Sequence, residues 1–130
     1  MIDKIAWIYI KDKKVLCTLS KGKNTYYSPG GKREEGETDE ETLIREVKEE
    51  LSVDIKKDTI QYYGTFEAQA DGKGEGVIVK MTCYLAEYEG TLNPASEIEK
   101  FDWLDTSHMD KISLAGRLIF EDLKKRGLIS

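Results

Sequence analysis

A single helix near the middle of the chain constrains the fold more than any other segment. Between residues 40 and 51, apolar residues such as Leu43 and Val47 recur at helical spacing, so one side of this helix can pack against a sheet. Strand-like segments lie on both sides of it, at residues 5–10, 15–20, 60–69 and 77–88. A last helix is predicted over residues 113–126. This order of elements predicts an α/β layered domain with a mixed sheet.

Several local patterns add detail to this layout. Residues 5–10 are nearly all apolar, which is typical of a strand covered on both faces, and Asp12-Lys13 predicts a tight turn after it. The segment 70–76 contains three glycines, and the sequence leaves open whether it is an ordinary hairpin loop or a mobile flap over a ligand. The apolar stripe expected on the last helix consists of Leu114, Ala115, Leu118, Ile119 and Leu123.

The apolar runs and the potential soft metal ligands exclude several classes of protein. The longest apolar run covers residues 5–10, far short of the roughly 20 residues needed to cross a bilayer, and the first residues do not form a secretory signal. We therefore expect a cytoplasmic protein with no membrane partner. Two cysteines, Cys17 and Cys83, and one histidine, His108, are too few for a structural zinc site with four ligands. Reduced, buried thiols are expected instead.

The net charge of −5 is concentrated in part of the chain. Residues 1–30 carry six lysines and two aspartates, whereas residues 31–60 carry six basic and eleven acidic side chains. An acidic chain without a stripe of arginines or lysines is a poor candidate for binding duplex nucleic acid. A dense group of carboxylates favours divalent cations instead, and polyphosphates are the anions that such cations would carry.

Three glutamates of the central helix share one face. At 100° per residue, Glu49 and Glu50 lie at about 300° and about 40° when Glu46 is placed at zero. Like charges one turn apart destabilise a helix by a few tenths of a kcal/mol, so an ordinary solvated face would more often interleave lysines. Mg²⁺ and Mn²⁺ are hard ions that take such oxygen ligands. The preceding turn at residues 28–32, Ser-Pro-Gly-Gly-Lys, can place a backbone carbonyl and Lys32 beside this face.

The paired glycines and the acidic helix belong to one longer motif. Gly31 is followed after five residues by Glu37, and after seven more by the segment 45–53, Arg-Glu-Val-Lys-Glu-Glu-Leu-Ser-Val. This resembles the signature of the Nudix hydrolases, here called the Nudix box. Every fixed position matches except one, because Ser52 replaces the last glycine. The resemblance implies the α/β/α sandwich of that family, with a mixed sheet, as a single Nudix domain over residues 1–130.

The resemblance also implies how the box residues act. Glu46, Glu49 and Glu50 are expected to bind the divalent ions, with the carbonyl of Gly30 as a further ligand, and Mg²⁺ is the expected cofactor, for which Mn²⁺ can substitute. Family members hydrolyse a nucleoside diphosphate linked to another group and cut within the pyrophosphate. The metals would bridge phosphate oxygens, lower the pKa of a bound water and stabilise charge during an in-line displacement. Glu49 and Glu50 are therefore also expected to be catalytic.

Supporting residues are expected around these glutamates. Arg45 and Glu37 resemble the family's supporting pair, in which the arginine orients a metal-binding glutamate, so we include Arg45 among the catalytic residues. The expected substrate-binding residues are Gly31, Lys32 and Lys21. For each lysine, a solvated side chain without a ligand is the competing interpretation.

A catalytic base or extra metal ligand is expected outside the box, shortly before a tryptophan of the next strand. Glu97, Glu99 and Asp102 precede Trp103. We favour Glu97 as both base and metal ligand, because it lies in a loop entering that strand, from which a carboxylate can turn toward the helix face. An exposed loop acid without a role is the alternative for each of the three.

The residues downstream of the box narrow the expected substrate. Ala68 and Ala70 stand where the family's ADP-ribose hydrolases have a marker proline and its dinucleoside polyphosphate hydrolases have a marker tyrosine. A nucleoside triphosphate, or a related nucleoside diphosphate derivative, is left by elimination. Removal of pyrophosphate from RNA 5′ ends is one alternative, against which the acidic surface argues. A non-catalytic nucleotide-sensing domain is another, although such domains usually lose box carboxylates. The sequence leaves a homodimer open.

Overall fold

A computed structural model describes all residues from 1 to 130. The β-strands are β1 Ile2–Ile8, β2 Ile10–Lys11, β3 Lys14–Ser20, β4 Tyr26–Tyr27, β5 Gly30–Gly31, β6 Asp54–Ile55, β7 Gln61–Gln69, β8 Ile78–Leu85, β9 Tyr88–Glu89 and β10 Ile98–Leu104. The α-helices are α1 Asp39–Leu51 and α2 Leu114–Lys125, and short 3₁₀ helices span Lys57–Thr59 and Thr106–Lys111. No helix is long and apolar enough to cross a membrane.

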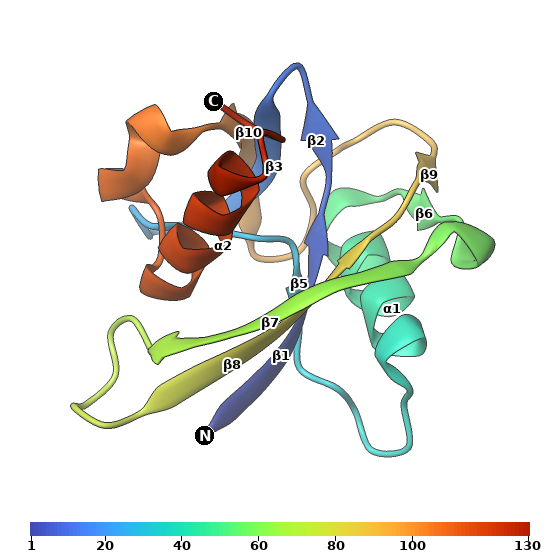
Figure 1. Ribbon diagram of the computed structural model, residues 1–130. Helices are drawn as coiled ribbons and strands as arrows, with labels where there is room; N and C mark the ends of the chain where they lie inside the picture. Colours follow the sequence, from blue (N-terminus) through green and yellow to red (C-terminus); the bar gives the residue numbers. More distant parts are fainter.

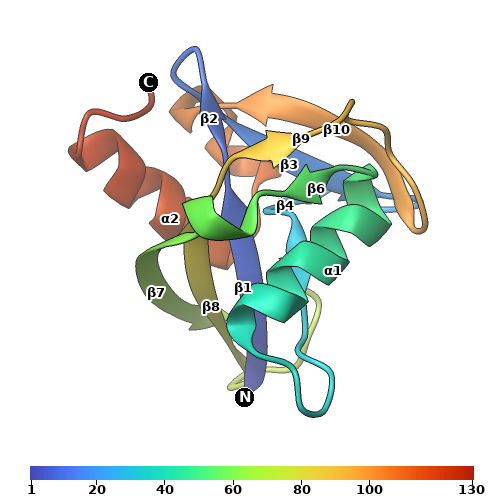
Figure 2. The ribbon, with the colours of Figure 1, turned by 90° about the vertical axis from the view of Figure 1, so that its right-hand side faces the viewer.

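The longest strands form a mixed sheet with the order β5-β1-β8-β7. β1 and β8 are parallel, whereas β5 pairs antiparallel with β1, and β7 pairs antiparallel with β8. A second, antiparallel sheet contains β10, β3 and β2, with β4 beside β3. Figures 1 and 2 show α1 and α2 on opposite sides of these strands. The α/β architecture with a mixed sheet is therefore confirmed.

Alternating side chains of β1 pack into two separate apolar cores. Ala6 and Ile8 belong to the apolar cluster that includes the buried side of α2, whereas Ile5 and Trp7 belong to the cluster around α1. All four are at most 1% exposed, which confirms that this strand is covered on both faces. The indole N–H of Trp7 donates to the carbonyl oxygen of Ala86 at 3.0 Å, so the one polar atom of this buried ring has a partner.

The ends of α1 are fixed by side chains. The Glu41 N–H donates to Thr38 Oγ1 at 3.1 Å and the Thr38 N–H donates to Glu41 Oε1 at 2.9 Å, which is a capping box. At the other end, Ser52 adopts a left-handed conformation with φ of 65°. Its hydroxyl donates to the Asn93 carbonyl at 3.0 Å. A serine thus makes the turn for which the Nudix box has glycine, and the hydrogen bond offsets part of the backbone strain.

The structure corrects several details of the expected layout. Leu118 is 38% exposed and leaves the expected apolar stripe, while Phe120 is fully buried in its place. The first strand begins at Ile2 and ends at Ile8, so the apolar run expected as one strand is divided between β1 and β2. The expected strand 77–88 likewise ends at Leu85, because Tyr88 pairs with β6 in a separate two-stranded sheet. Cys17 and Cys83 are buried free thiols, as expected.

The capping box gives a direct test of what holds α1 in place. Thr38→Ala removes the side-chain oxygen that accepts the Glu41 N–H, so the free energy of unfolding should fall by about 1 kcal/mol. Thr38→Ser keeps that oxygen and should lose much less. Urea unfolding followed by circular dichroism measures both values. Equal stability of the wild type and Thr38→Ala would contradict this account of the helix start.

Candidate active site

Arg45 of α1 is the hydrogen-bonding centre of the acidic face. Its Nε and Nη2 donate to the two carboxylate oxygens of Glu37, at 2.7 Å and 3.0 Å. This two-point bond lowers the pKa of Glu37 to about 2 and raises the pKa of Arg45. Both groups therefore stay charged over the whole physiological pH range. The structure thus brings together the arginine and glutamate expected to form a supporting pair.

The same guanidinium also holds two box glutamates and the preceding loop. Arg45 Nη1 donates to Glu46 Oε1 at 2.9 Å and lies 3.3 Å from both carboxylate oxygens of Glu49. Arg45 Nη2 also donates to the Lys32 carbonyl at 3.0 Å. Glu46 is mostly covered, whereas the Glu49 side chain is 50% exposed. Arg45 therefore fixes the position of two carboxylates and ties α1 to the end of β5.

Glu50 is the buried carboxylate of the group. Its Oε1 accepts the backbone N–H of Gly30 at 3.0 Å, and no cationic side chain forms a salt bridge with it. Burial, together with the nearby charges of Glu46 and Glu97, raises the pKa of Glu50 to about 8, against the opposing effects of the Gly30 hydrogen bond and the Lys4 charge. Burial likewise raises the pKa of Glu46. These carboxylates are therefore held close together, and the positive charge nearby is not enough to neutralise them.

The paired glycines of β5 permit this close approach. Gly30 has φ of 140° and a Cβ there would collide with the carbonyl oxygen of Ile5, while a Cβ on Gly31 would lie 2.5 Å from the Glu46 carboxyl carbon. Only glycine lets β5 pair with β1 and still leave room for the acidic side chains of α1. The two glycines therefore set the distance between the sheet and the acidic face.

Two of the box carboxylates lie in the wall of a large cleft. This cleft has a volume of about 740 Å³, and both Glu46 and Glu50 line it. Its other walls come from the loop at residues 22–25, from residues 28–32 and from the tip of the loop that follows β7. A volume of this size falls in the range of roughly 300–1,000 Å³ typical of small-molecule sites. The cleft is therefore large enough for a nucleotide.

Among the three candidate acids outside the box, Glu97 is the one that lines the cleft. It lines the cleft beside Glu46 and Glu50, and its backbone carbonyl accepts the Lys21 N–H at 2.8 Å. The loop before it is joined to the end of α1, because the Ser96 hydroxyl donates to the Glu49 carbonyl at 3.2 Å. These contacts aim the loop acid at the acidic face of the helix.

The two other candidate acids lie elsewhere. Glu99 is exposed and does not line the cleft. Asp102 accepts a hydrogen bond from the Tyr26 hydroxyl and lies 3.6 Å from Lys100 Nζ. Asp102 therefore joins β10 to β4, and the structure brings only Glu97 together with the box glutamates.

The lysines of the site differ partly from those expected. Lys32 and Gly31 line the cleft, but Lys21 does not, and Lys23 lines it instead. Lys4 is a cleft residue that sequence reasoning missed; burial and the neighbouring Lys32 lower its pKa. The sequence did contain a signal for Lys4, because it is a lysine next to an apolar strand. A charged side chain that is half buried there is unusual unless it has a function.

The donor set fits a hard divalent cation, although the carboxylates do not converge in the observed rotamers. No three acidic, histidine or cysteine side chains are arranged as metal ligands. Arg45 accounts for this, because it occupies oxygens of Glu46 and Glu49. All available donors are oxygens, and Glu50 is a buried carboxylate with a single hydrogen-bond donor, which is the chemistry that Mg²⁺ and Mn²⁺ satisfy. The chemistry of the donor set therefore fits such an ion.

The sequence and the fold are similar to those of known proteins. Residues 3–123 match the family model of the NUDIX domain. The uncharacterized Nudix hydrolase YvcI of Bacillus subtilis (strain 168) is 27% identical over 124 residues, which are 91% of this chain and 77% of that protein. The E. coli ORF135 protein superposes with a TM-score of 0.73 at 24% identity, over 95% of this chain and 91% of that one.

A MutT protein from Bacillus halodurans superposes with a TM-score of 0.71 at 25% identity, over 93% of this chain and 80% of that one. These likenesses confirm the Nudix fold, and the family model covers most of the chain. The chain therefore belongs to the Nudix hydrolases, a family of pyrophosphohydrolases that act on acid anhydrides and generally use a divalent metal ion.

Proposed function

We propose that this chain is a Mg²⁺-dependent Nudix hydrolase that converts a nucleoside triphosphate and water into a nucleoside monophosphate and pyrophosphate, as a single domain over residues 1–130. The observation that carries the proposal is the joint presence of Glu46, Glu50 and Glu97 with three lysines in one cleft. Carboxylates attract the cation and ammonium groups attract phosphate oxygens, so the cleft suits a magnesium-bound polyphosphate.

The proposed metal ligands are four carboxylates and one backbone oxygen. Glu46, Glu50 and Glu97 line the cleft, Glu49 lies beside Glu46 on Arg45, and the backbone oxygen is the carbonyl of Gly30. A bound Mg²⁺ or Mn²⁺ supplies charge neutralisation at the phosphates and makes a coordinated water more acidic. Arg45 is a positioning residue in this scheme, because its hydrogen bonds to Glu46 and Glu49 orient the carboxylates of these two ligands.

The chain's own groups would carry out the remaining steps. Lys23 and Lys32 are in place to bind phosphate oxygens of the substrate. Glu97 would act as the base that takes a proton from the attacking water. In-line attack on the phosphorus of the first phosphate then breaks its bond to the bridging oxygen, and pyrophosphate leaves. Orientation and charge stabilisation supply most of the catalysis in such a displacement.

The surroundings of the cleft favour a small nucleotide as the partner. The cleft is lined by four acidic residues, a poor surface for duplex nucleic acid at cellular salt. The box carboxylates are all present, which favours catalysis over nucleotide sensing alone. Both cysteines are buried thiols, which suits the reducing cytoplasm that we propose as the location.

The proposed function is tested by a screen of nucleotides with Mg²⁺ that measures orthophosphate and pyrophosphate separately. We expect pyrophosphate from at least one nucleoside triphosphate. Triphosphorylated RNA is included as a separate substrate, and faster release of pyrophosphate from RNA would favour the RNA 5′-end alternative. Binding of nucleotides without turnover of any would overturn the proposal in favour of a sensor.

The metal requirement gives the first prediction from this scheme. Because the acidic face has oxygen donors only, activity should vanish in EDTA and return with excess Mg²⁺ or Mn²⁺. Ca²⁺ is the control, since its longer bonds and looser geometry should restore binding more than turnover. Full turnover in the chelator would contradict the proposed metal site.

Replacement of Glu50 separates ligand chemistry from folding. Glu50→Gln keeps the size of the side chain and removes a ligand charge, so kcat should fall by roughly two orders of magnitude or more.

In EDTA, the folded wild type keeps a proton on Glu50 between its ordinary pKa of 4.5 and its raised pKa of about 8, whereas the unfolded chain has lost it. The free energy of unfolding of the wild type should therefore fall as the pH rises through that window.

The glutamine variant cannot ionise and should show a smaller drop. Thermal unfolding in EDTA at pH 5 and pH 8 measures this difference, and steady-state kinetics with Mg²⁺ measures kcat. A variant that is unfolded at both pH values would show that Glu50 is a structural residue, and wild-type kcat in a folded variant would contradict its role as a metal ligand.

The acid outside the box is tested by matched variants. If Glu97 is the base or a ligand, Glu97→Gln should lower kcat by about 10²-fold or more, because general-base catalysis contributes roughly 10² to 10⁴. Glu99→Gln, a control outside the cleft, should stay within a few-fold of the wild type. Asp102→Asn should affect stability more than kcat, because Asp102 bonds Tyr26. A silent Glu97→Gln with an inactive Glu99→Gln would contradict this assignment.

A further inference from the structure

A second, smaller pocket adjoins the acidic cleft. It has a volume of about 180 Å³. Lys4, Tyr27, Asp71 and Met81 line both the pocket and the cleft, so the two hollows share a wall. A ligand with a charged end and an uncharged end can therefore lie in both at once.

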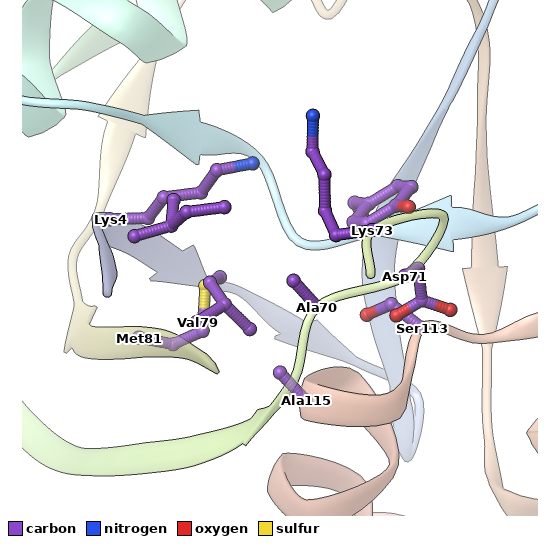
Figure 3. A pocket seen from close by; sticks show the side chains of 10 residues that line it. Lys4, Ala70, Asp71, Lys73, Val79, Met81, Ser113 and Ala115 are labelled. Carbon is purple, nitrogen blue, oxygen red and sulfur yellow. The ribbon is translucent and has the colours of Figure 1, made fainter. Parts of the chain in front are cut away.

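The walls of this pocket are mainly apolar. Ile2 of β1, Val79 and Met81 of β8, Ala70 after β7 and Ala115 of α2 supply them. In Figure 3, Lys4 lies above Val79 and Met81 on one side, Asp71 and Ser113 lie together on the other, and Ala70 lies between the two groups. An apolar slot with a few polar groups at its ends is typical of sites that hold a flat ring.

Lys4 and Asp71, which lie at opposite ends of the pocket, differ in hydrogen-bonding capacity. The Lys4 ammonium can only donate, and it lies 5.8 Å from the centre of the Tyr27 ring. One oxygen of Asp71 accepts the Leu114 N–H at 2.9 Å, which holds the loop after β7 against the start of α2 and leaves the second oxygen free to accept from a ligand. The pocket therefore offers a donor at one end and an acceptor at the other.

The volume limits the size of the ring. An apolar cavity of about 150 Å³ is known to hold one benzene molecule, so about 180 Å³ accommodates a six-membered ring and its substituents. A purine has a second ring fused to the first and would leave part of its surface outside the pocket or press against its walls. Size therefore favours a pyrimidine.

Resting on the proposed function, we propose that this pocket holds the base of a pyrimidine nucleotide whose phosphates occupy the cleft. Lys4 donates to a ring carbonyl oxygen, and Asp71 accepts from a ring N–H or an amino group. Lys4 and Asp71 are thus specificity-determining residues of this chain. The glycine-containing segment 70–76 forms one wall of the base site, which gives a role to a loop whose function the sequence left open.

Binding without catalysis tests this proposal. Isothermal titration calorimetry in EDTA, with CMP and UMP against AMP and GMP, measures base preference without any hydrolysis. We expect the pyrimidine nucleotides to bind about tenfold more tightly or better, since a misfit of a single methylene in an apolar pocket is already worth roughly 10–200-fold. Equal or tighter binding of the purine nucleotides by the wild type would overturn the proposal.

Variants of pocket residues then test whether the preference for pyrimidine nucleotides comes from this pocket. Lys4→Gln should weaken pyrimidine binding about tenfold, whereas Lys80→Gln, which removes the same charge from a neighbouring strand outside the pocket, should leave it unchanged. Met81→Ala enlarges the pocket and should reduce the preference for pyrimidines, and Val79→Ala is a milder version of the same change in case the first variant does not fold. An unchanged preference in Lys4→Gln and in a folded enlarged variant would overturn the assigned pocket.

The two proposals fail in different ways. Selective binding of pyrimidine nucleotides with no turnover of any nucleotide would overturn the proposed hydrolysis and leave the base site intact. Turnover of purine and pyrimidine triphosphates with equal kcat/KM, together with equal binding, would overturn the base site and leave the hydrolysis intact.

Discussion

The bidentate bond between Arg45 and Glu37 is the interaction on which the acidic site depends. Through it, one guanidinium is held where it also reaches Glu46, Glu49 and the Lys32 carbonyl. The start of α1, its acidic face and the end of β5 are therefore joined through one side chain. The antiparallel register of β5 with β1 adds the second constraint, because it brings the Gly30 N–H to the buried Glu50 carboxylate.

This arrangement has an energetic cost that the rest of the fold must offset. Buried Glu50 has one N–H donor and no salt-bridge partner, and its neighbours Glu46 and Glu97 carry the same charge, so ionising all of them without a cation is unfavourable. Two apolar cores on opposite sides of β1 hold the strand and α1 rigid against that repulsion. A divalent cation would turn the same repulsion into a binding energy, which explains why such a costly cluster can be useful.

Local patterns in the sequence predicted the elements and the box, because helical spacing, paired glycines and motif spacing are properties of neighbouring residues. What they missed depends on packing between distant segments. Lys4 lines the cleft beside Met81 of the neighbouring strand β8, and Lys21 does not line it although its N–H donates to the Glu97 carbonyl. Leu118 fitted the helical stripe, yet α2 is rotated so that Phe120 is buried instead. The choice of Glu97 among three nearby acids rested on loop position, and the structure places only that one in the cleft.

Direct measurement of metal binding tests the central claim, that the clustered carboxylates of α1 form a site for a divalent cation. Titration with Mn²⁺, followed by the loss of the free-ion electron paramagnetic resonance signal, gives the dissociation constant without any substrate. The account predicts saturable binding that weakens by about tenfold or more in Glu50→Gln. Glu40→Gln, which removes the same charge from an exposed position of the same helix, should bind as the wild type does. Equal Mn²⁺ affinity in the wild type and Glu50→Gln would contradict the account.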